Sequence, residues 1–197
     1  MAVPQQPVFY YDLGSPQCYL VGETIMSTLP VVPEWEPVLA SRIAASESAE
    51  DPDRAELERL IGELGLQAMR WPTRWPPDST RAMLAATYAK KVGRGVAFSL
   101  AAFRQEFAGG RDIGDENTVL IAGAACEMHP VALTKGIELR STAQALHTAG
   151  ERAIDAGVRS LPAIQVGNDI YRGGEALSQA ASALSQAASA ITQEQQP

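Results

Sequence analysis

Ser15 and Cys18 are the residues of this chain whose types and spacing suggest chemistry. The segment Ser-Pro-Gln-Cys has the frame of a Cys-X-X-Cys redox motif, with a hydroxyl in place of the first sulfur. A hydroxyl donates a hydrogen bond to a thiolate but forms no disulfide. We therefore predict that Ser15 handles the sulfur of a bound molecule. No His or Asp stands at a spacing that would make Ser15 part of a hydrolytic triad.

The position of Ser15 supports this prediction. A β-prone run over residues 8–12 is followed by Gly14, and Pro16 suits the first position of a helix because its φ is preset. Ser15 is then at the N-cap, in the partial positive field of free backbone N–H groups. A thiol pKa near 8.5 must fall by about one or two units for ionisation at neutral pH, and a charge-assisted hydrogen bond with a helix terminus is of that size. The alternative is that Ser15 only caps the helix.

The two cysteines, Cys18 and Cys126, do not form the pattern of a disulfide scaffold. Cys18 lies one turn into the expected helix, where an inert, buried cysteine is the simpler interpretation. The alternative is a redox thiol that forms a mixed disulfide with a ligand. Cys126 is expected to be a packing residue. His129 and His147 are isolated from other ligand types, so we predict no metal site.

The N-terminal elements follow the order strand, helix, strand. We expect a strand at 8–12, a helix at 16–29 and a second strand at 34–40. The helical crossover implies that the two strands are parallel. Pro37 favours an edge position for the second strand, because proline donates no ladder hydrogen bond.

The middle of the chain is expected to be helical. Apolar residues at helical spacing or capping residues predict helices near 57–64, 79–91, 96–107, 115–125, from 130 onward, and 139–156. After Gly157 the pattern changes to a short strand at 162–166, a tight turn at 167–169 and a return strand. The last helix carries a seven-residue repeat over 177–190, which predicts docking along a narrow Ala/Leu face.

This order of elements, with four sequence segments, resembles the DsbA-like thioredoxin-fold proteins, and most closely the 2-hydroxychromene-2-carboxylate isomerases and kappa-class glutathione transferases. The segments are 9–16 (Phe-Tyr-Tyr-Asp-Leu-Gly-Ser-Pro), 71–76 (Trp-Pro-Thr-Arg-Trp-Pro), 103–115 (Phe-Arg-Gln-Glu-Phe-Ala-Gly-Gly-Arg-Asp-Ile-Gly-Asp), and 157–163 (Gly-Val-Arg-Ser-Leu-Pro-Ala) with 171–177 (Tyr-Arg-Gly-Gly-Glu-Ala-Leu). The resemblance implies an α/β, thioredoxin-like fold with an inserted all-helical domain. The thioredoxin-like domain is expected at 1–45 and 157–197, and the insert at 46–156.

The resemblance also implies a glutathione site. Ser15 is expected to bind the glutathione thiolate, and a cis peptide bond between Leu161 and Pro162 is expected to turn the Leu161 backbone toward the cysteinyl part of glutathione. Gly174 and Glu175 are expected near the γ-glutamyl end, although a glutamate in a first helical turn is also simply stabilising.

Further residues are candidates for the pocket of a second substrate. Trp71, Arg74 and Trp75 lie in a proline-rich loop, where aromatic rings with an arginine suit an aromatic acid. The alternative is that the tryptophans cover the helical insert. Tyr11 and Cys18 are pocket candidates from the strand and the helix, although core packing is the simpler interpretation for both.

The composition limits the partners. A formal net charge of −7 argues against nucleic acid or an anionic membrane, and no apolar run reaches the roughly 20 residues of a membrane span. The absence of a leader-like segment leads us to expect a cytosolic (cytoplasmic) protein with a small aromatic or electrophilic substrate. A homodimer is expected by analogy with the relatives.

Three functions are compatible with these observations. The first is a glutathione-dependent isomerase or transferase, in which glutathione is the cofactor. The second is a DsbA-like thiol-disulfide oxidoreductase that uses Cys18 alone, and the third is a binding protein that keeps the cleft without the chemistry.

Overall fold

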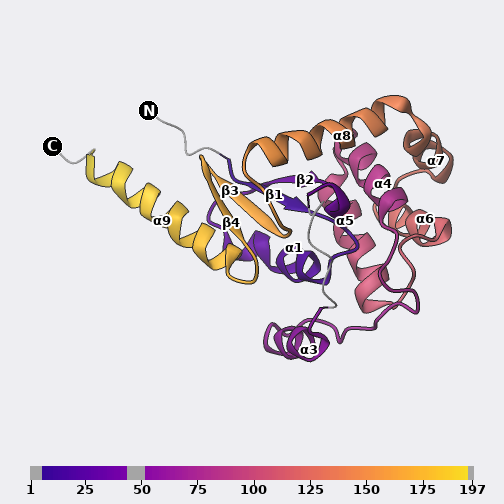
Figure 1. Ribbon diagram of the computed structural model, residues 1–197, viewed down its shortest axis with the longest axis horizontal. Helices are drawn as coiled ribbons and strands as arrows, with labels where there is room; N and C mark the ends of the chain where they lie inside the picture. Colours follow the sequence, from indigo (N-terminus) through magenta and orange to yellow (C-terminus); the bar gives the residue numbers. More distant parts are fainter. Residues whose placement is uncertain (1–5, 44–51, 195–197) are drawn as a thin grey trace.

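The computed structural model describes residues 6–43 and 52–194. A four-stranded sheet and a group of helices beside it make up this part of the chain (Figure 1). In chain order the elements are β1 (Val8–Tyr11), α1 (Pro16–Thr28), β2 (Glu34–Pro37), α2 (Ala40–Ile43), α3 (Arg54–Glu63), α4 (Thr80–Lys91), α5 (Gly95–Phe103), the π-helix η1 (Arg104–Ala108), α6 (Glu116–Ala125), α7 (Pro130–Glu138), α8 (Arg140–Asp155), β3 (Ala163–Val166), β4 (Asp169–Arg172) and α9 (Ala176–Glu194).

The sheet has the strand order β2-β1-β3-β4. β1 pairs in parallel with β2, with Phe9 opposite Trp35, and antiparallel with β3, with Phe9 opposite Ile164. The expected parallel pair and the edge position of the proline-containing strand are therefore confirmed. The expected strand over 34–40 is too long, because β2 ends at Pro37 and α2 begins at Ala40.

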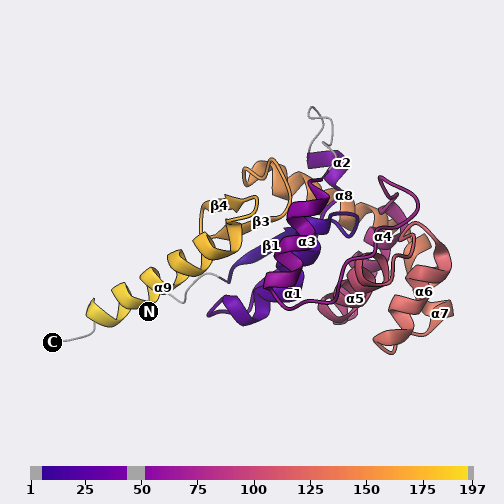
Figure 2. The same cartoon turned by 90° about the horizontal axis from the view of Figure 1, so that it is seen from below.

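Alternate side chains of β1 enter two different cores. Phe9 and Tyr11 belong to the larger cluster, which contains residues of α1 and α9, whereas Tyr10 belongs to a smaller cluster with residues of α8. This alternation follows from the two-residue period of a strand. Figure 2 shows α1 and α8 on opposite sides of β1. The architecture is a thioredoxin-like α/β fold with additional helices.

The helices of the middle segment follow their local signals. Asp53 and Asp115 cap α3 and α6 through their side chains, and Pro130 opens α7 behind His129. The sequence analysis expected one continuous helix over 96–107. In the structure α5 ends at Phe103 and a π-helix follows it, so this expectation is corrected. The expected boundary at residues 45–46 lies outside the described residues, so the division into two domains stays a prediction.

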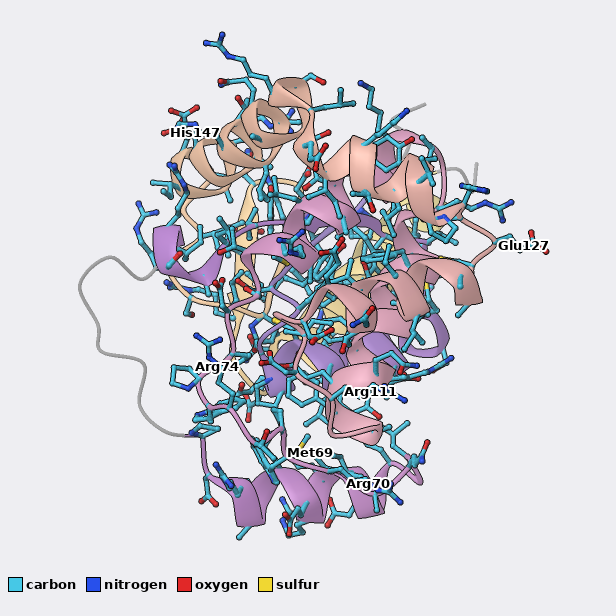
Figure 3. All side chains as sticks on the ribbon, turned by 90° about the vertical axis from the view of Figure 1, so that its right-hand side faces the viewer. Met69, Arg70, Arg74, Arg111, Glu127 and His147 are labelled. Atoms are coloured by element: carbon cyan, nitrogen blue, oxygen red, sulfur yellow. The ribbon has the colours of Figure 1, made fainter. Side chains whose placement is uncertain are left out.

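The segment between α3 and α4 runs as an extended loop from Leu64 to Ser79. Figure 3 shows Met69 and Arg70 of this loop near α3 and Arg74 farther from that helix. The loop is attached to η1 by the hydrogen bond that the Arg70 N–H donates to the carbonyl of Phe107 over 2.7 Å. A cis peptide bond, Trp75–Pro76, lies in its last third. The loop is therefore held against the helical segment on its way to the site.

The C-terminal helix α9 packs on the sheet through one narrow face. Ala176, Ala180 and Leu184 are buried at a spacing of four residues, in agreement with the docking predicted from the repeat. Farther along, α9 extends away from the rest of the molecule (Figure 1). Across the described part of the chain, no helix has both the length and the apolar character needed to cross a membrane.

Candidate functional site

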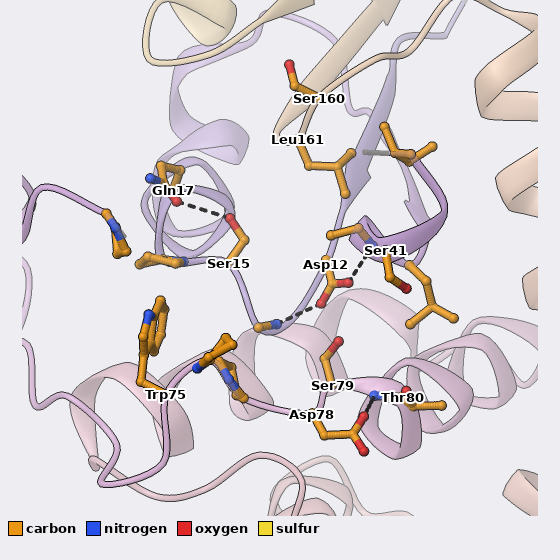
Figure 4. Close-up of a pocket in the computed structure, with 18 residues that line it drawn as sticks. Asp12, Ser15, Gln17, Ser41, Trp75, Asp78, Ser79, Thr80, Ser160 and Leu161 are labelled. Carbon is orange, nitrogen blue, oxygen red and sulfur yellow. Dashed lines mark hydrogen bonds between the residues drawn. The ribbon is translucent and has the colours of Figure 1, made fainter. Parts of the chain in front are cut away.

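A cavity of about 400 Å³ lies where the loops that follow β1 and β2 meet the loops that precede α4 and β3. Its described wall consists of Asp12, residues 14–17, residues 39–41 with Ile43, Pro52, residues 75–80, and Ser160 with Leu161. Figure 4 shows these residues around a common space, with Ser15 and Asp12 on one side and Trp75 near the opposite loop. The cavity therefore joins segments that are far apart in the sequence.

Ser15 is the N-cap of α1, as its sequence context predicted. Its backbone is extended, with φ −103° and ψ 118°, and its Oγ accepts a hydrogen bond from the N–H of Cys18 over 3.2 Å. The hydroxyl proton is directed to Oε1 of Gln17, 3.3 Å away, which also lines the cavity. An acceptor that enters the cavity can replace Gln17 as the partner of this proton. Capping and ligand binding are thus compatible roles of one hydroxyl.

Leu161, which precedes Pro162, lies on the cavity wall together with the start of α1. Their peptide bond is cis, the isomer that the resemblance implied, and Leu161 lines the cavity together with Ser15. β3 begins only at Ala163, and among the described residues the N–H and C=O of Leu161 have no hydrogen-bond partner. These two backbone groups can pair with an extended ligand, in the manner of an added strand.

Asp12 is a site residue that the sequence analysis did not select. Its carboxylate is almost fully buried, with Oδ1 accepting from the N–H of Gly14 over 2.8 Å and Oδ2 from the N–H of Ala40 over 2.7 Å. Burial raises the pKa of Asp12, although the Ala40 N–H, the Ser79 hydroxyl and the Gly14 N–H each act to lower it. A signal was available, because an aspartate two residues before a glycine favours a turn closed by its own side chain.

Cys18 and Tyr11 lie beneath the cavity and do not line it. The Cys18 side chain is fully buried, and burial raises the pKa of its thiol to about 12. The Tyr11 hydroxyl lies 2.6 Å from Oγ of Ser99, and burial raises the pKa of Tyr11 as well. Both side chains are core residues, which is the simpler of the two interpretations made from the sequence.

The proline-rich loop contributes one of its two tryptophans to the cavity wall. Trp75 lines the cavity, whereas Trp71 packs edge-on against Trp75 at 5.2 Å between ring centroids. Trp71 also lies under the guanidinium of Arg54 and donates to Oε1 of Glu58 over 3.3 Å, so it joins α3 to Trp75. Arg74 is exposed and is not among the lining residues.

Gly174 and Glu175 lie outside this cavity. Both are exposed in the turn before α9, and Oε2 of Glu175 accepts a hydrogen bond from Nε2 of Gln179 over 3.0 Å. The structure therefore brings together Ser15, Leu161 and Trp75, but not the turn at Gly174. The turn nevertheless lies beside the start of β3, because the Gly173 N–H donates to the carbonyl of Pro162 over 3.4 Å.

The titratable side chains of the described cavity wall are acidic. They are Asp12 and Asp78, and the described lining includes no His, Lys or Arg. Asp78 is exposed, and hydrogen bonds from the side chain and N–H of Thr80 lower its pKa. Within residues 6–43 and 52–194, no group of three His, Cys, Asp or Glu side chains is arranged to hold a metal ion.

A second buried acid, Glu106, lies behind the site in η1. Its side chain is fully buried, and neither carboxylate oxygen has a hydrogen-bond partner among the described residues. Burial raises the pKa of Glu106 well above its usual range, and the charges of Asp12 and Asp112 raise it further. A sequence signal for the burial of Glu106 existed. It lies three residues after Phe103 and directly before Phe107, on an otherwise apolar helix face.

Comparison with known proteins finds similar solved structures but no similar sequences. No family model matches the chain, and no curated protein matches its sequence. A structure of 2-hydroxychromene-2-carboxylate isomerase superposes with a TM-score of 0.84 at 14% identity, covering 98% of this chain and 100% of the other. A probable DsbA oxidoreductase from Streptomyces coelicolor has a TM-score of 0.74 at 16% identity, covering 98% and 92%. The cytosolic disulfide reductase DsbM from Pseudomonas aeruginosa, in a structure with GSH, has a TM-score of 0.68 at 12% identity, covering 95% and 99%. The fold is thus that of the DsbA-like thioredoxin proteins, and at these identities the likeness concerns the fold alone.

The buried position of Glu106 predicts a pH-dependent stability. A raised pKa in the folded protein means that the folded state holds the Glu106 proton at pH values where the unfolded state has lost it. The free energy of unfolding should therefore fall as the pH rises above the ordinary glutamate pKa, by at most about 1.4 kcal/mol per pH unit. Glu106→Gln, which remains neutral, should remove this part of the slope in urea unfolding at several pH values. The exposed variant Glu138→Gln should keep it, and identical slopes for Glu106→Gln and the unchanged protein would contradict the prediction.

Tyr11→Phe tests whether Tyr11 serves the core. The change removes the hydroxyl that faces Ser99 and leaves Oγ of Ser99 without this partner, which should lower the free energy of unfolding by about 1 kcal/mol. Ligand binding in the cavity should stay unchanged, because Tyr11 does not line it. Thermal unfolding and calorimetric titration measure the two effects, and weaker binding at unchanged stability would contradict this assignment.

Proposed function

We propose that this chain is a glutathione-dependent enzyme, an isomerase or a transferase, that stabilises the glutathione thiolate with Ser15 at the N-terminus of α1. The observation that carries the proposal is the direction of the Ser15 hydroxyl. It caps α1 with its oxygen and points its proton to Oε1 of Gln17, at the cavity wall. A thiolate near Gln17 would accept that proton and would lie in the positive field of the first helical turn.

Two further features support a peptide thiol as the ligand. The N–H and C=O of Leu161, which have no partner among the described residues, belong to the same cavity wall as Ser15 and suit the backbone of an extended peptide. One structural neighbour, the disulfide reductase DsbM, is described in a structure with GSH. The γ-glutamyl end of glutathione would then extend toward Gly174 and Glu175.

The chemistry follows from a thiolate beside an apolar wall. The thiolate would add to a carbon conjugated with a carbonyl group, which forms a carbon–sulfur bond and moves an electron pair onto the carbonyl oxygen. In an isomerase, rotation about the former double bond and loss of the thiolate would complete the reaction. In a transferase, protonation would leave a stable conjugate. Trp75, Leu39 and Ile43 would face the substrate.

A DsbA-like oxidoreductase is the second candidate, because two of the structural neighbours are described as thiol-disulfide enzymes. It would depend on Cys18, whose thiol is buried and whose pKa of about 12 keeps it protonated. These features support the hydroxyl over the thiol as the reactive group. We propose a cytosolic location and a homodimer only by analogy with such relatives.

Ser15→Ala tests the proposed function. The change removes the hydroxyl proton that would bind the thiolate. A charge-assisted hydrogen bond contributes about 1.5–3 kcal/mol. We therefore expect a loss of roughly tenfold or more both in glutathione affinity and in turnover of conjugated aromatic electrophiles. Calorimetric titration with glutathione and a conjugation assay measure both. Ser41→Ala, which alters a hydroxyl elsewhere on the cavity wall, is the matched control. Undiminished turnover in Ser15→Ala would refute this role of Ser15.

Cys18→Ala separates the two candidates. Because the thiol is buried and outside the cavity wall, we expect glutathione binding and turnover to persist, with a loss of roughly 1 kcal/mol in the free energy of unfolding from the small cavity left behind. Stopped-flow reaction of the unchanged protein with a thiol reagent should show slow modification of Cys18. A folded Cys18→Ala protein without activity would assign the chemistry to the thiol.

A further inference from the structure

We infer that Asp12 is the general base of this site, which takes the proton from the bound thiol and later returns it to the product. The inference rests on the proposed thiol-binding function. In the first step the S–H bond breaks and an O–H bond forms on the Asp12 carboxylate. In the last step the carbon or oxygen that received the electron pair takes the proton back, so that atoms and charge balance over the cycle.

The inventory of the cavity wall points to Asp12. Ser15 already directs its proton outward, so its hydroxyl acts as a donor to the sulfur. Asp12 and Asp78 are the acids among the described lining residues, and these residues include no imidazole, amine or thiol. Asp78 is exposed and its pKa is lowered, which makes it the weaker base.

The surroundings of Asp12 disfavour its negative charge. It is buried and its charge is opposed by Asp78 from the loop before α4, while Glu106 from η1 is a second buried acid nearby. Cys18 of α1 and Tyr11 of β1, which are also close enough to be affected by the charge of Asp12, are neutral groups at pH 7. Transfer of the thiol proton to Asp12 moves the charge from this buried carboxylate to a sulfur at the start of a helix, where the field favours it.

A raised pKa of Asp12 and a lowered pKa of the bound thiol both favour transfer of the proton from the thiol to Asp12. In water a thiol and an aspartic acid differ by about 4 to 5 pKa units, which would leave the proton on sulfur. Burial raises the pKa of Asp12, and the Ser15 hydroxyl with the helix terminus would lower that of the thiol. The backbone N–H groups of Gly14 and Ala40 and the Ser79 hydroxyl occupy three of the about four acceptor sites of the carboxylate, which leaves one for the incoming proton. Asp12 and Ser15 both line the cavity, and Figure 4 shows the Asp12 carboxylate turned to its two backbone N–H donors and the Ser15 hydroxyl turned to Gln17.

The test follows the thiol proton during glutathione binding at neutral pH. Ultraviolet absorbance reports whether the bound thiol is ionised, and calorimetry in two buffers of different ionisation enthalpy counts the protons released to solution. S-methylglutathione, which has no thiol proton, corrects for the other ionisable groups of the ligand. For the unchanged protein we expect a thiolate signal without net proton release, because Asp12 retains the proton.

Asp12→Asn should abolish the combination of a thiolate signal and no net proton release. The variant should either show the thiolate with about one proton released per ligand, or bind the thiol un-ionised. Asp155→Asn, which changes an exposed aspartate outside the cavity wall, is the matched control and should behave like the unchanged protein. Because an amide in place of the carboxylate cannot accept from both backbone N–H groups and the variant could fail to fold, the unchanged protein offers a second measurement: the infrared band of a protonated carboxylic acid should appear when glutathione binds.

Three results would overturn the inference: a proton released stoichiometrically by the unchanged protein, the absence of the carboxylic acid band when the thiolate forms, or a folded Asp12→Asn protein that still forms thiolate without release. A failure of the proposed function looks different, because neither glutathione nor S-methylglutathione would then bind. Binding without any thiolate signal would refute both the base and the thiolate mechanism while retaining the cleft.

Discussion

The two hydrogen bonds of the Asp12 carboxylate are the constraint on which the site depends. One oxygen holds the N–H of Gly14 and so sets the turn from which Ser15 and α1 begin, and the other holds the N–H of Ala40 at the start of α2. The carboxylate thus joins the loops that follow two parallel strands. A buried acid is costly unless it is hydrogen-bonded, so this arrangement stabilises the loops only while both N–H groups stay in place. The geometry of the cavity and the protonation of Asp12 are therefore coupled.

The first turn of α1 separates two groups that are close in the sequence. Ser15 caps the helix and faces the cavity, while Cys18, three residues later, lies in the core beneath it. Burial disfavours the charged form of a thiol, whereas the N-cap position is open to a ligand and to the helix field. The frame of a redox motif is retained, but the only thiol in it cannot reach the cavity. A sulfur that reacts in this cleft must be supplied by a ligand.

Local sequence was sufficient to predict most elements of the fold and the capping role of Ser15. The start of α1 at Pro16, the cap Asp115, and the edge strand with Pro37 all depend on interactions within a few residues. The hydrogen bond from the Ala40 N–H spans 28 residues, which no local pattern encodes. The π-helix around Glu106 and the separation of Trp71 from the cavity likewise depend on packing between distant segments. Tyr11 and Cys18 were named as pocket candidates with core packing as the simpler interpretation, and they lie in the core, whereas Asp12 was not selected because its contact with Ala40 is distant in the sequence.

The charge of the cavity limits how a thiolate can be stabilised here. The described wall has acidic groups and no basic side chain, so the charge on sulfur has to be offset by a hydroxyl, by backbone N–H groups and by the field of α1. These dipoles are weaker than a full positive charge at the same distance, and a thiolate formed beside an ionised Asp12 would be repelled. A thiol proton that remains in the cavity avoids this second negative charge. The lack of a basic side chain on the described wall and the burial of Asp12 are both compatible with the proposed mechanism, in which a thiol would be ionised without a change in the net charge of the cleft.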